Sequence, residues 1–187
     1  MEFCESFLEK IIMTKNEIIT ATEKIFSTFT SYCNGINEPA FFNKPTAKWS
    51  VAENVRHLVI ATNTSTLAFV VPKFLVRLIS GTPNRKSRSY EELVAKYKKK
   101  LEDGGAASGR FVPKPFTIKY GKEKLMHQWT KAAAKQLSSL RKSKETDLDR
   151  YLVKHPLLGK ITLRELCYFT IYHTQHHLNT ITLSTAT

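Results

Sequence analysis

The stretch TLRELCYFTIYHTQHHLNTITL, residues 162–183, predicts one long uninterrupted helix. It contains neither glycine nor proline, and Glu165 follows Thr162 at the three-residue spacing of a capping box. Steps of three or four residues along this helix place two histidines in one row with residues that suit a protein core. The row consists of Leu166, Thr170, His173, His177 and Ile181. We therefore expect both histidines to face the interior.

Apolar residues at helical spacing predict three further long helices. These extend roughly from Glu5 to Cys33, from Ser50 to about Val71, and from about Lys122 to Arg141. The second of them has its own capping-box pattern, because Glu53 follows Ser50 by three residues. Four long helices in one chain favour a helical bundle.

The connection between the second and third of these helices is predicted to hold shorter ones. Pro72 ends or kinks the second helix, Lys73 to Ile79 suit one or two further turns, and Tyr90 to Glu102 suit a short helix. No alternating strand pattern or hairpin signal is evident. We therefore expect an all-α four-helix bundle with extra short helices in the connection between helices two and three, as a single domain over residues 1–187.

Length and composition suit a globular protein without a membrane span. Of the 187 residues, 42% are hydrophobic and 24% are charged, the balance of a protein that folds in water. The longest apolar stretch, Leu67 to Ile79, is interrupted by Pro72, Lys73 and Arg77 and falls short of the roughly 20 residues that cross a bilayer. The N-terminal segment lacks a signal-peptide pattern and the three cysteines are widely spaced, so we expect a cytoplasmic protein with free thiols.

The chain carries a large excess of positive charge. Its 29 lysines and arginines against 16 acidic residues give a formal charge of +13, which favours anionic partners or substrates. The basic runs at 85–88, 96–100 and 141–144 have neither interleaved aromatic residues nor a recognition-helix motif. We expect a solvated basic surface and do not expect nucleic acid as a partner. Monomer and homodimer both stay open, since isologous dimers are common among bundles of this size.

The histidine pair of the last helix has the spacing of metal ligands. His173 and His177 are four residues apart, which puts them about 40 degrees apart on one helix face. Two buried imidazoles repel when protonated and need partners when neutral, and one cation bound between them removes both difficulties. Such pairs also occur by chance. His176 lies at the edge of that face, and we interpret His127 and His155 as structural.

His57 is the candidate for a third ligand, because it lies on the inward stripe of the second helix. Small residues follow it on that stripe and would leave room for water or a substrate beside an ion. Three nitrogen ligands with an open position are typical of a catalytic zinc-type site. The alternative for His57 is a hydrogen-bonded core histidine. Glu53 is either the capping-box partner of Ser50 or a catalytic residue that orients an imidazole or accepts a proton.

Two segments resemble signatures of the DinB/YfiT-like family of metalloenzymes. KWSVAENVRHLV, residues 48–59, resembles the second-helix signature, with a Trp, a Ser or Thr, a Glu, and a His followed by Leu. HPLLGKITLRELCYFTIYHTQHHLNTI, residues 155–181, resembles the C-terminal signature, in which HP and a Gly precede a helix carrying HxxxH. Thr180 departs from the family pattern, which commonly has Gln there. The two segments occur in the family's order.

The resemblance implies a four-helix bundle that holds one divalent metal ion, often zinc or nickel, between His57, His173 and His177. It also implies a metal-dependent hydrolase or a transferase that uses a low-molecular-weight thiol such as bacillithiol, mycothiol or glutathione. We therefore expect a metalloenzyme that activates water or a thiol toward a small-molecule substrate. The alternative is a non-catalytic metal-binding protein associated with stress or with protein interactions, because fold and site do not fix the reaction.

Overall fold

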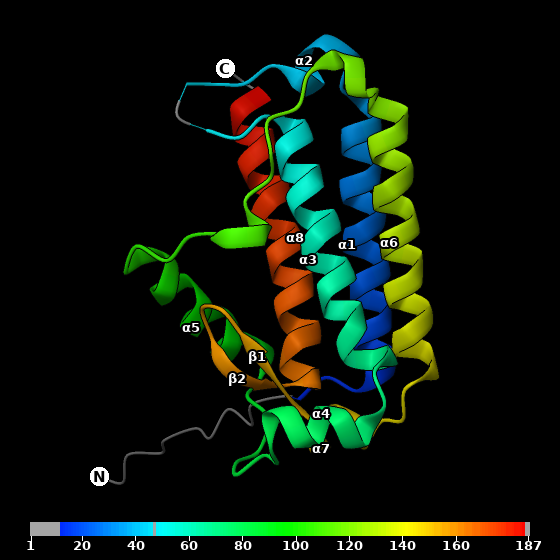
Figure 1. The fold of residues 1–187 in the computed structure, drawn as a ribbon, viewed down its shortest axis with the longest axis vertical. Helices are drawn as coiled ribbons and strands as arrows, with labels where there is room; N and C mark the ends of the chain where they lie inside the picture. Colours follow the sequence, from blue (N-terminus) through cyan, green and yellow to red (C-terminus); the bar gives the residue numbers. More distant parts are fainter. Residues whose placement is uncertain (1–11, 47, 186–187) are drawn as a thin grey trace, which may run out of the picture.

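Four long helices lie side by side and form a bundle (Figure 1). The computed structural model describes residues 12–46 and 48–185. The bundle consists of α1 (Lys15–Gly35), α3 (Val51–Val70), α6 (Lys122–Lys142) and α8 (Leu163–Thr185). Helix α3 packs against α6 and α8, and α1 packs against the same two helices. The predicted four-helix bundle is confirmed.

The starts of the bundle helices follow their capping residues. Ser50 and Glu53 form the predicted capping box at α3, and a second box of Thr14 and Glu17 starts α1. Because Thr14 is an N-cap, residues 12–14 are not helical, and the predicted start of this helix at Glu5 lies outside the described residues. At α8, the backbone N–H of Thr162 donates to Glu165 and that of Glu165 donates to the Thr162 hydroxyl, as the sequence predicts.

Short helices fill the connection between α3 and α6. They are α4 (Lys73–Ser80), α5 (Tyr90–Glu102) and two single 3₁₀ turns, η1 (Gly109–Phe111) and η2 (Ile118–Tyr120). The predicted short helices are therefore present. A further helix, α2 (Glu38–Phe42), lies between α1 and α3, where the sequence analysis expected none. It forms because Asn37 caps it and Pro39 suits its first turn.

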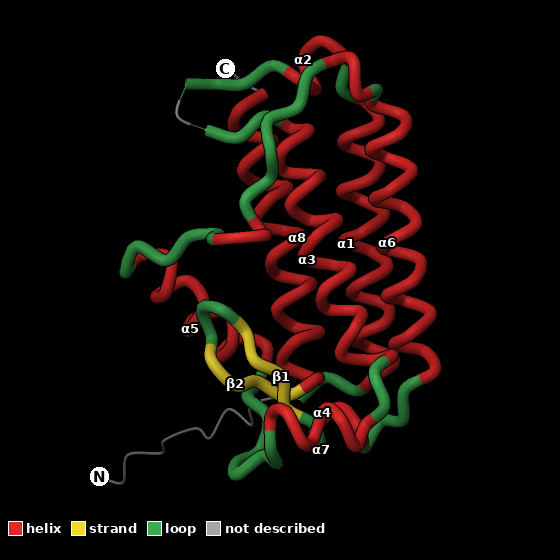
Figure 2. The backbone as a smooth tube through the Cα atoms, in the orientation of Figure 1, coloured by secondary structure: helices red, strands yellow, loops and turns green. Residues whose placement is uncertain are grey.

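A small antiparallel hairpin precedes α8 and was not predicted. It follows the short helix α7 (Asp147–Arg150) and consists of β1 (Leu152–His155) and β2 (Gly159–Thr162), drawn in yellow in Figure 2. Each strand has four residues, too few for a clear alternation of apolar and polar side chains. The turn closes at Gly159, whose φ of 74° suits glycine. The hairpin packs on α4 and α8.

The core lies between the four long helices and is rich in aromatic side chains. The Trp129 ring is fully buried and meets the rings of Phe26 and Phe29 edge-on, with both centroid distances at 5.1 Å. No single helix in the described part of the chain is long and apolar enough to cross a membrane; α3 and α4 reach that composition only as a pair bent by 109°.

Candidate metal centre

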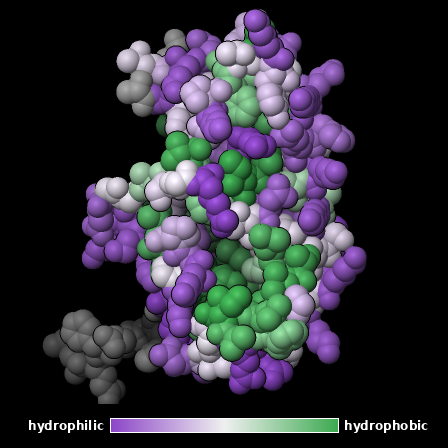
Figure 3. Space-filling model, viewed as in Figure 1, coloured by the Kyte–Doolittle hydropathy of each residue, from purple (hydrophilic) through white to green (hydrophobic). Residues whose placement is uncertain are grey.

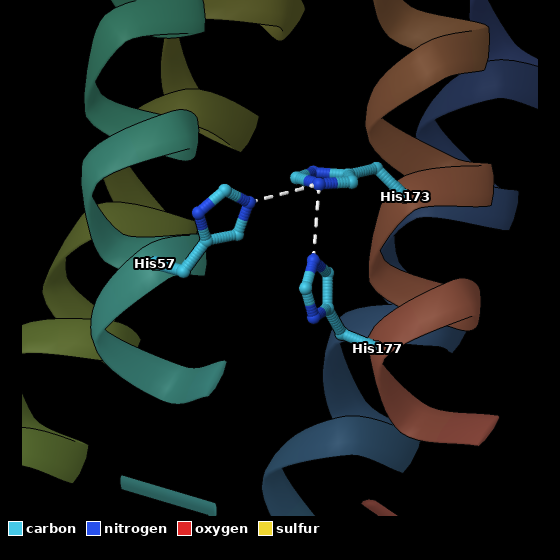
Figure 4. Close-up of side chains that lie close together, drawn as sticks. All are labelled: His57, His173 and His177. Carbon is cyan, nitrogen blue, oxygen red and sulfur yellow. Dashed lines mark hydrogen bonds between the residues drawn. The ribbon is translucent and has the colours of Figure 1, made fainter. Parts of the chain in front are cut away.

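Three buried histidines from α3 and α8 point their rings at one another (Figure 4). His57 is 4% exposed, and His173 and His177 are each 6% exposed. The Nε2 atom of His173 lies 3.0 Å from that of His57 and 3.1 Å from that of His177. The structure thus brings together the three histidines that the sequence singled out. His127, by contrast, is exposed on α6.

The proton of His57 is held on the far side of its ring. Its Nδ1 lies 2.7 Å from the backbone oxygen of Phe111, at the end of η1. A carbonyl oxygen only accepts hydrogen bonds, so Nδ1 must carry the proton. The neutral ring then presents the lone pair of Nε2 to the other two histidines.

His177 is oriented in the same way by Asn54. The Nδ1 atom of His177 lies 2.7 Å from Oδ1 of Asn54. The amide nitrogen of Asn54 donates to the backbone oxygens of Ser50, at 2.8 Å, and Trp49, at 3.3 Å, and this fixes which way the amide faces. Nδ1 of His177 is therefore the donor, and its Nε2 also presents a lone pair. Histidine ligands of metals commonly donate their second nitrogen to an oxygen in this way.

Protons alone cannot satisfy the three facing nitrogens. His173 can donate one Nε2 proton, and that proton can point at only one of its two neighbours. Adding a charge is costly, because burial and then the neighbouring histidines lower the pKa of His173 and His177 well below the usual value. Burial likewise lowers the pKa of His57. A cation would accept all three lone pairs together.

The spacing of the nitrogens fits one ion. Imidazoles about 2.1 Å from a tetrahedral cation hold their nitrogens about 3.4 Å apart, so the rings need to spread by only a few tenths of an ångström. Within the described residues, the candidate ligand atoms of this group all lie within 4.8 Å of one another. Three imidazoles suit zinc, nickel, iron and copper. The residues present therefore fit a divalent transition metal.

Aromatic side chains fix the orientation of the imidazoles. The ring of Phe169 stacks on His173 at a centroid distance of 4.7 Å. Trp49 lies parallel to His177 and contacts His57 at a centroid distance of 5.1 Å. Rings held by such packing lose little entropy when they bind an ion.

Glu53 lies one turn before His57, with its carboxylate directed at the helix start. One oxygen accepts from the backbone N–H of Ser50 at 2.7 Å, and the other accepts from Lys44 at 3.0 Å. Of the two roles that the sequence analysis left open for Glu53, this geometry is that of the capping-box partner of Ser50. Asn54 and the carbonyl of Phe111, which the sequence analysis missed, hold the imidazoles instead.

A cleft of about 830 Å³ adjoins all three histidines. It is bounded by α3, α4, α5, α8, the hairpin and the loop before η1, and Figure 3 shows a hollow on this face beside a gathering of hydrophobic side chains. Tyr97 of α5 lines it, is 5% exposed, and has no hydrogen-bond partner for its hydroxyl among the described residues. Burial raises the pKa of Tyr97 to about 12, so the hydroxyl stays protonated and can donate to a bound molecule.

Comparison with known proteins agrees with this architecture. A family model for the DinB superfamily matches residues 21–181, which span the bundle and all three histidines. The chain belongs to the DinB superfamily. This membership confirms the resemblance that the two sequence segments indicated.

The fold of this DinB protein also occurs among solved structures. It is similar to the colibactin self-resistance protein ClbS, crystallised in complex with double-stranded DNA, with a TM-score of 0.54 and 16% sequence identity. The match covers 93% of this chain and 96% of ClbS. At this identity the likeness shows the fold alone. No curated protein sequence matches the chain.

Proposed function

We propose that this DinB protein is a metal-dependent enzyme in which His57, His173 and His177 hold one divalent cation, zinc or nickel. The observation that carries the proposal is the convergence of three Nε2 atoms, with two of the rings, those of His57 and His177, fixed through their Nδ1 atoms by Phe111 and Asn54. A buried cluster with more facing lone pairs than protons is costly unless it binds a cation. The adjoining cleft gives a substrate access to the three rings.

The ion would act as a Lewis acid that lowers the pKa of a water molecule or a thiol and so supplies a nucleophile at neutral pH. The protein's part is to hold three neutral imidazoles in place and to leave one side of the cluster open to the cleft. Activation of water would make the protein a hydrolase. Activation of a low-molecular-weight thiol would make it an S-transferase.

Glu53 enters the proposal as a positioning residue at the start of α3. Its carboxylate holds the first turn of the helix through Ser50, four residues before Asn54. Its two carboxylate partners, Ser50 and Lys44, support this role over direct proton transfer. A conservative Glu53→Gln variant should therefore keep its metal content.

A turnover screen with and without metal tests the enzyme proposal. Metal-loaded protein should convert ester substrates with water, or electrophiles with a panel of thiols, and chelator-treated protein should not. Melting curves of the two samples separate the alternative of a non-catalytic metal-binding protein. A large loss of melting temperature with chelator and no turnover of any substrate would favour that alternative.

Duplex DNA is a second candidate ligand, supported by the formal charge of +13. ClbS, a solved structure with this fold, was crystallised with double-stranded DNA. Anisotropy titration of a labelled duplex of about 20 base pairs tests it. Affinity that falls by about 10³ or more between roughly 50 and 200 mM salt would support binding through phosphates, and absence of binding at the lower salt would remove this candidate.

A further inference from the structure

We infer that the cleft beside the three histidines takes a substrate with an extended apolar body and one anionic group, with the anionic group at the histidine end. The inference rests on the proposed function and names its substrate class. Three observations on the cleft carry it: its apolar walls, the sign of its charged side chains, and the positions of those charges relative to the histidines.

The walls of the cleft are mainly apolar along its whole length. Small and aliphatic side chains of α3, α4, α8 and the hairpin line it, among them Ala61, Ala68, Val76, Leu157 and Leu166. A volume of about 830 Å³ is within the range of sites that enclose small molecules, roughly 300–1,000 Å³. Burial of apolar surface is the main source of affinity that such walls offer.

The apolar surface continues out of the cleft over α4. Leu67 and Ile79 line the cleft and are 51% and 66% exposed, and the neighbouring Phe74 and Leu78 are 70% and 80% exposed. In Figure 3 these elements carry hydrophobic side chains beside the hollow. An apolar body longer than the cleft can therefore continue over this surface.

The charged side chains of the cleft are all positive. Lys48, Arg110 and Lys154 line it, and no aspartate or glutamate is among the described residues that do so. All three cations are exposed, and none forms an ion pair within the described part of the chain. A site of one charge sign favours ligands of the opposite sign.

Two of the three cations stand at the histidine end. Lys48 precedes Trp49, whose ring contacts His57, and Arg110 precedes Phe111, whose carbonyl accepts from the same histidine. The α4 side chains that line the far end include the aliphatic Val76 and Ile79. A ligand that satisfies both ends therefore places its anionic group near the histidines and its apolar body toward α4. Lys154, on the strand β1 that packs on α4, also lines the cleft.

A fluorescent fatty-acid analogue tests the inference. Full-length protein is titrated with 11-(dansylamino)undecanoic acid and with its uncharged methyl ester, and metal content is measured in the same samples. The acid should bind at least threefold more tightly than the ester, and this difference should shrink as salt screens the charges. Equal binding of acid and ester, or no binding of either, would overturn the inference.

Charge and volume variants locate the probe. Arg110→Glu should weaken binding of the acid about three- to tenfold and leave the ester unchanged, whereas the matched control Lys131→Glu, on the exposed face of α6, should change neither. Ala61→Trp, which fills the cleft between its two ends, should weaken both probes at least tenfold. An effect of Lys131→Glu equal to that of Arg110→Glu would contradict the inference.

The exposed position of Arg110 keeps the test valid if Ala61→Trp does not fold. The metal readout separates the two proposals. Probe binding lost with the metal retained overturns only the substrate class. Metal absent with probe binding retained overturns the proposed function.

Discussion

Two buried polar clusters on α8 differ in how their groups are satisfied. At the start of the helix, the fully buried carboxylate of Glu165 accepts from Arg85 at 2.7 and 2.9 Å, from Arg88 at 2.8 and 3.1 Å, and from the backbone of Thr162 at 2.9 Å. Two to three turns later, His173 and His177 face His57 with more lone pairs than protons. The first cluster is complete within the protein.

The difference shows that burial of polar groups does not by itself indicate a functional site. The Glu165 cluster ties residues 85–88 to α8 and leaves no oxygen in need of a ligand. Under the proposed function, a cation would complete the histidine cluster. The predictions below test this distinction, beginning with the largest effect.

Removal of the satisfied carboxylate should cost the most stability. Glu165→Ala should lower the free energy of unfolding by about 3 kcal/mol, because it leaves two arginines and two backbone N–H groups without their acceptor. In chelator-treated protein, His173→Ala should cost less than half as much, since it also removes crowding between imidazoles. Urea denaturation measures both, with Glu123→Ala on the exposed face of α6 as control. Equal losses at Glu165 and His173 would contradict the distinction.

Removal of the side chain that accepts the Nδ1 proton of His177 should weaken metal binding although all three histidines remain. Asn54→Ala deprives Nδ1 of His177 of its acceptor and should lower metal affinity about 10- to 100-fold. Asn54→Asp keeps an acceptor and should preserve the affinity. Competition with a chromophoric chelator measures it, with the exposed Asn63→Ala of the same helix as control. Unchanged affinity in Asn54→Ala would show that Asn54 does not position His177.

Acid should destabilise the protein through a histidine outside the cluster. Burial lowers the pKa of His155 to about 4 from its usual 6.5, and its Nδ1 accepts from the backbone N–H groups of Leu157 and Leu158. Between these two values the unfolded chain binds a proton that the folded protein does not, so stability falls as pH drops below 6.5. This group should cost about 2 kcal/mol by pH 5.

The matched variant for this effect is His155→Asn, which keeps an acceptor for the two N–H groups. Denaturation of chelator-treated protein at about pH 7.5 and about pH 5 should show a smaller acid loss in the variant, by about 2 kcal/mol. The same acid loss in both proteins would place the effect elsewhere.

The smallest effect is expected at Tyr97. Because its hydroxyl has no protein partner among the described residues, Tyr97→Phe should change the free energy of unfolding by less than about 0.5 kcal/mol. If the hydroxyl donates to a bound substrate, kcat/KM should fall severalfold in the same variant. A loss of more than about 1 kcal/mol of stability would instead indicate a hydrogen bond within the protein.

The long helices and the inward direction of the three histidines could be predicted because both depend on residue spacing within a single helix. Steps of three and four residues placed His57, His173 and His177 inward, and the capping residues Ser50 and Thr162 marked two helix starts. The prediction that His57 lies beside His173 and His177 also required that the two helices pack against each other. This expectation came from the family resemblance together with the inward-facing positions of the histidines.

The groups that complete the site could not be predicted in the same way. The acceptor for His57 is a backbone oxygen in a 3₁₀ turn, and a backbone carbonyl has no sequence signature. Asn54 is three residues before His57 on the same helix, and an amide at that spacing was an available signal. The hairpin escaped prediction because its strands are short, and the cleft because segments far apart in the sequence form it.

Metal content is the most direct test of the central claim. Elemental analysis of protein purified without an affinity tag should find about one zinc or nickel ion per chain, and His57→Ala and His177→Ala should each lose most of it. His127→Ala, which removes an exposed histidine of α6, should keep it. Metal content unchanged in both cluster variants, in folded protein, would contradict the account.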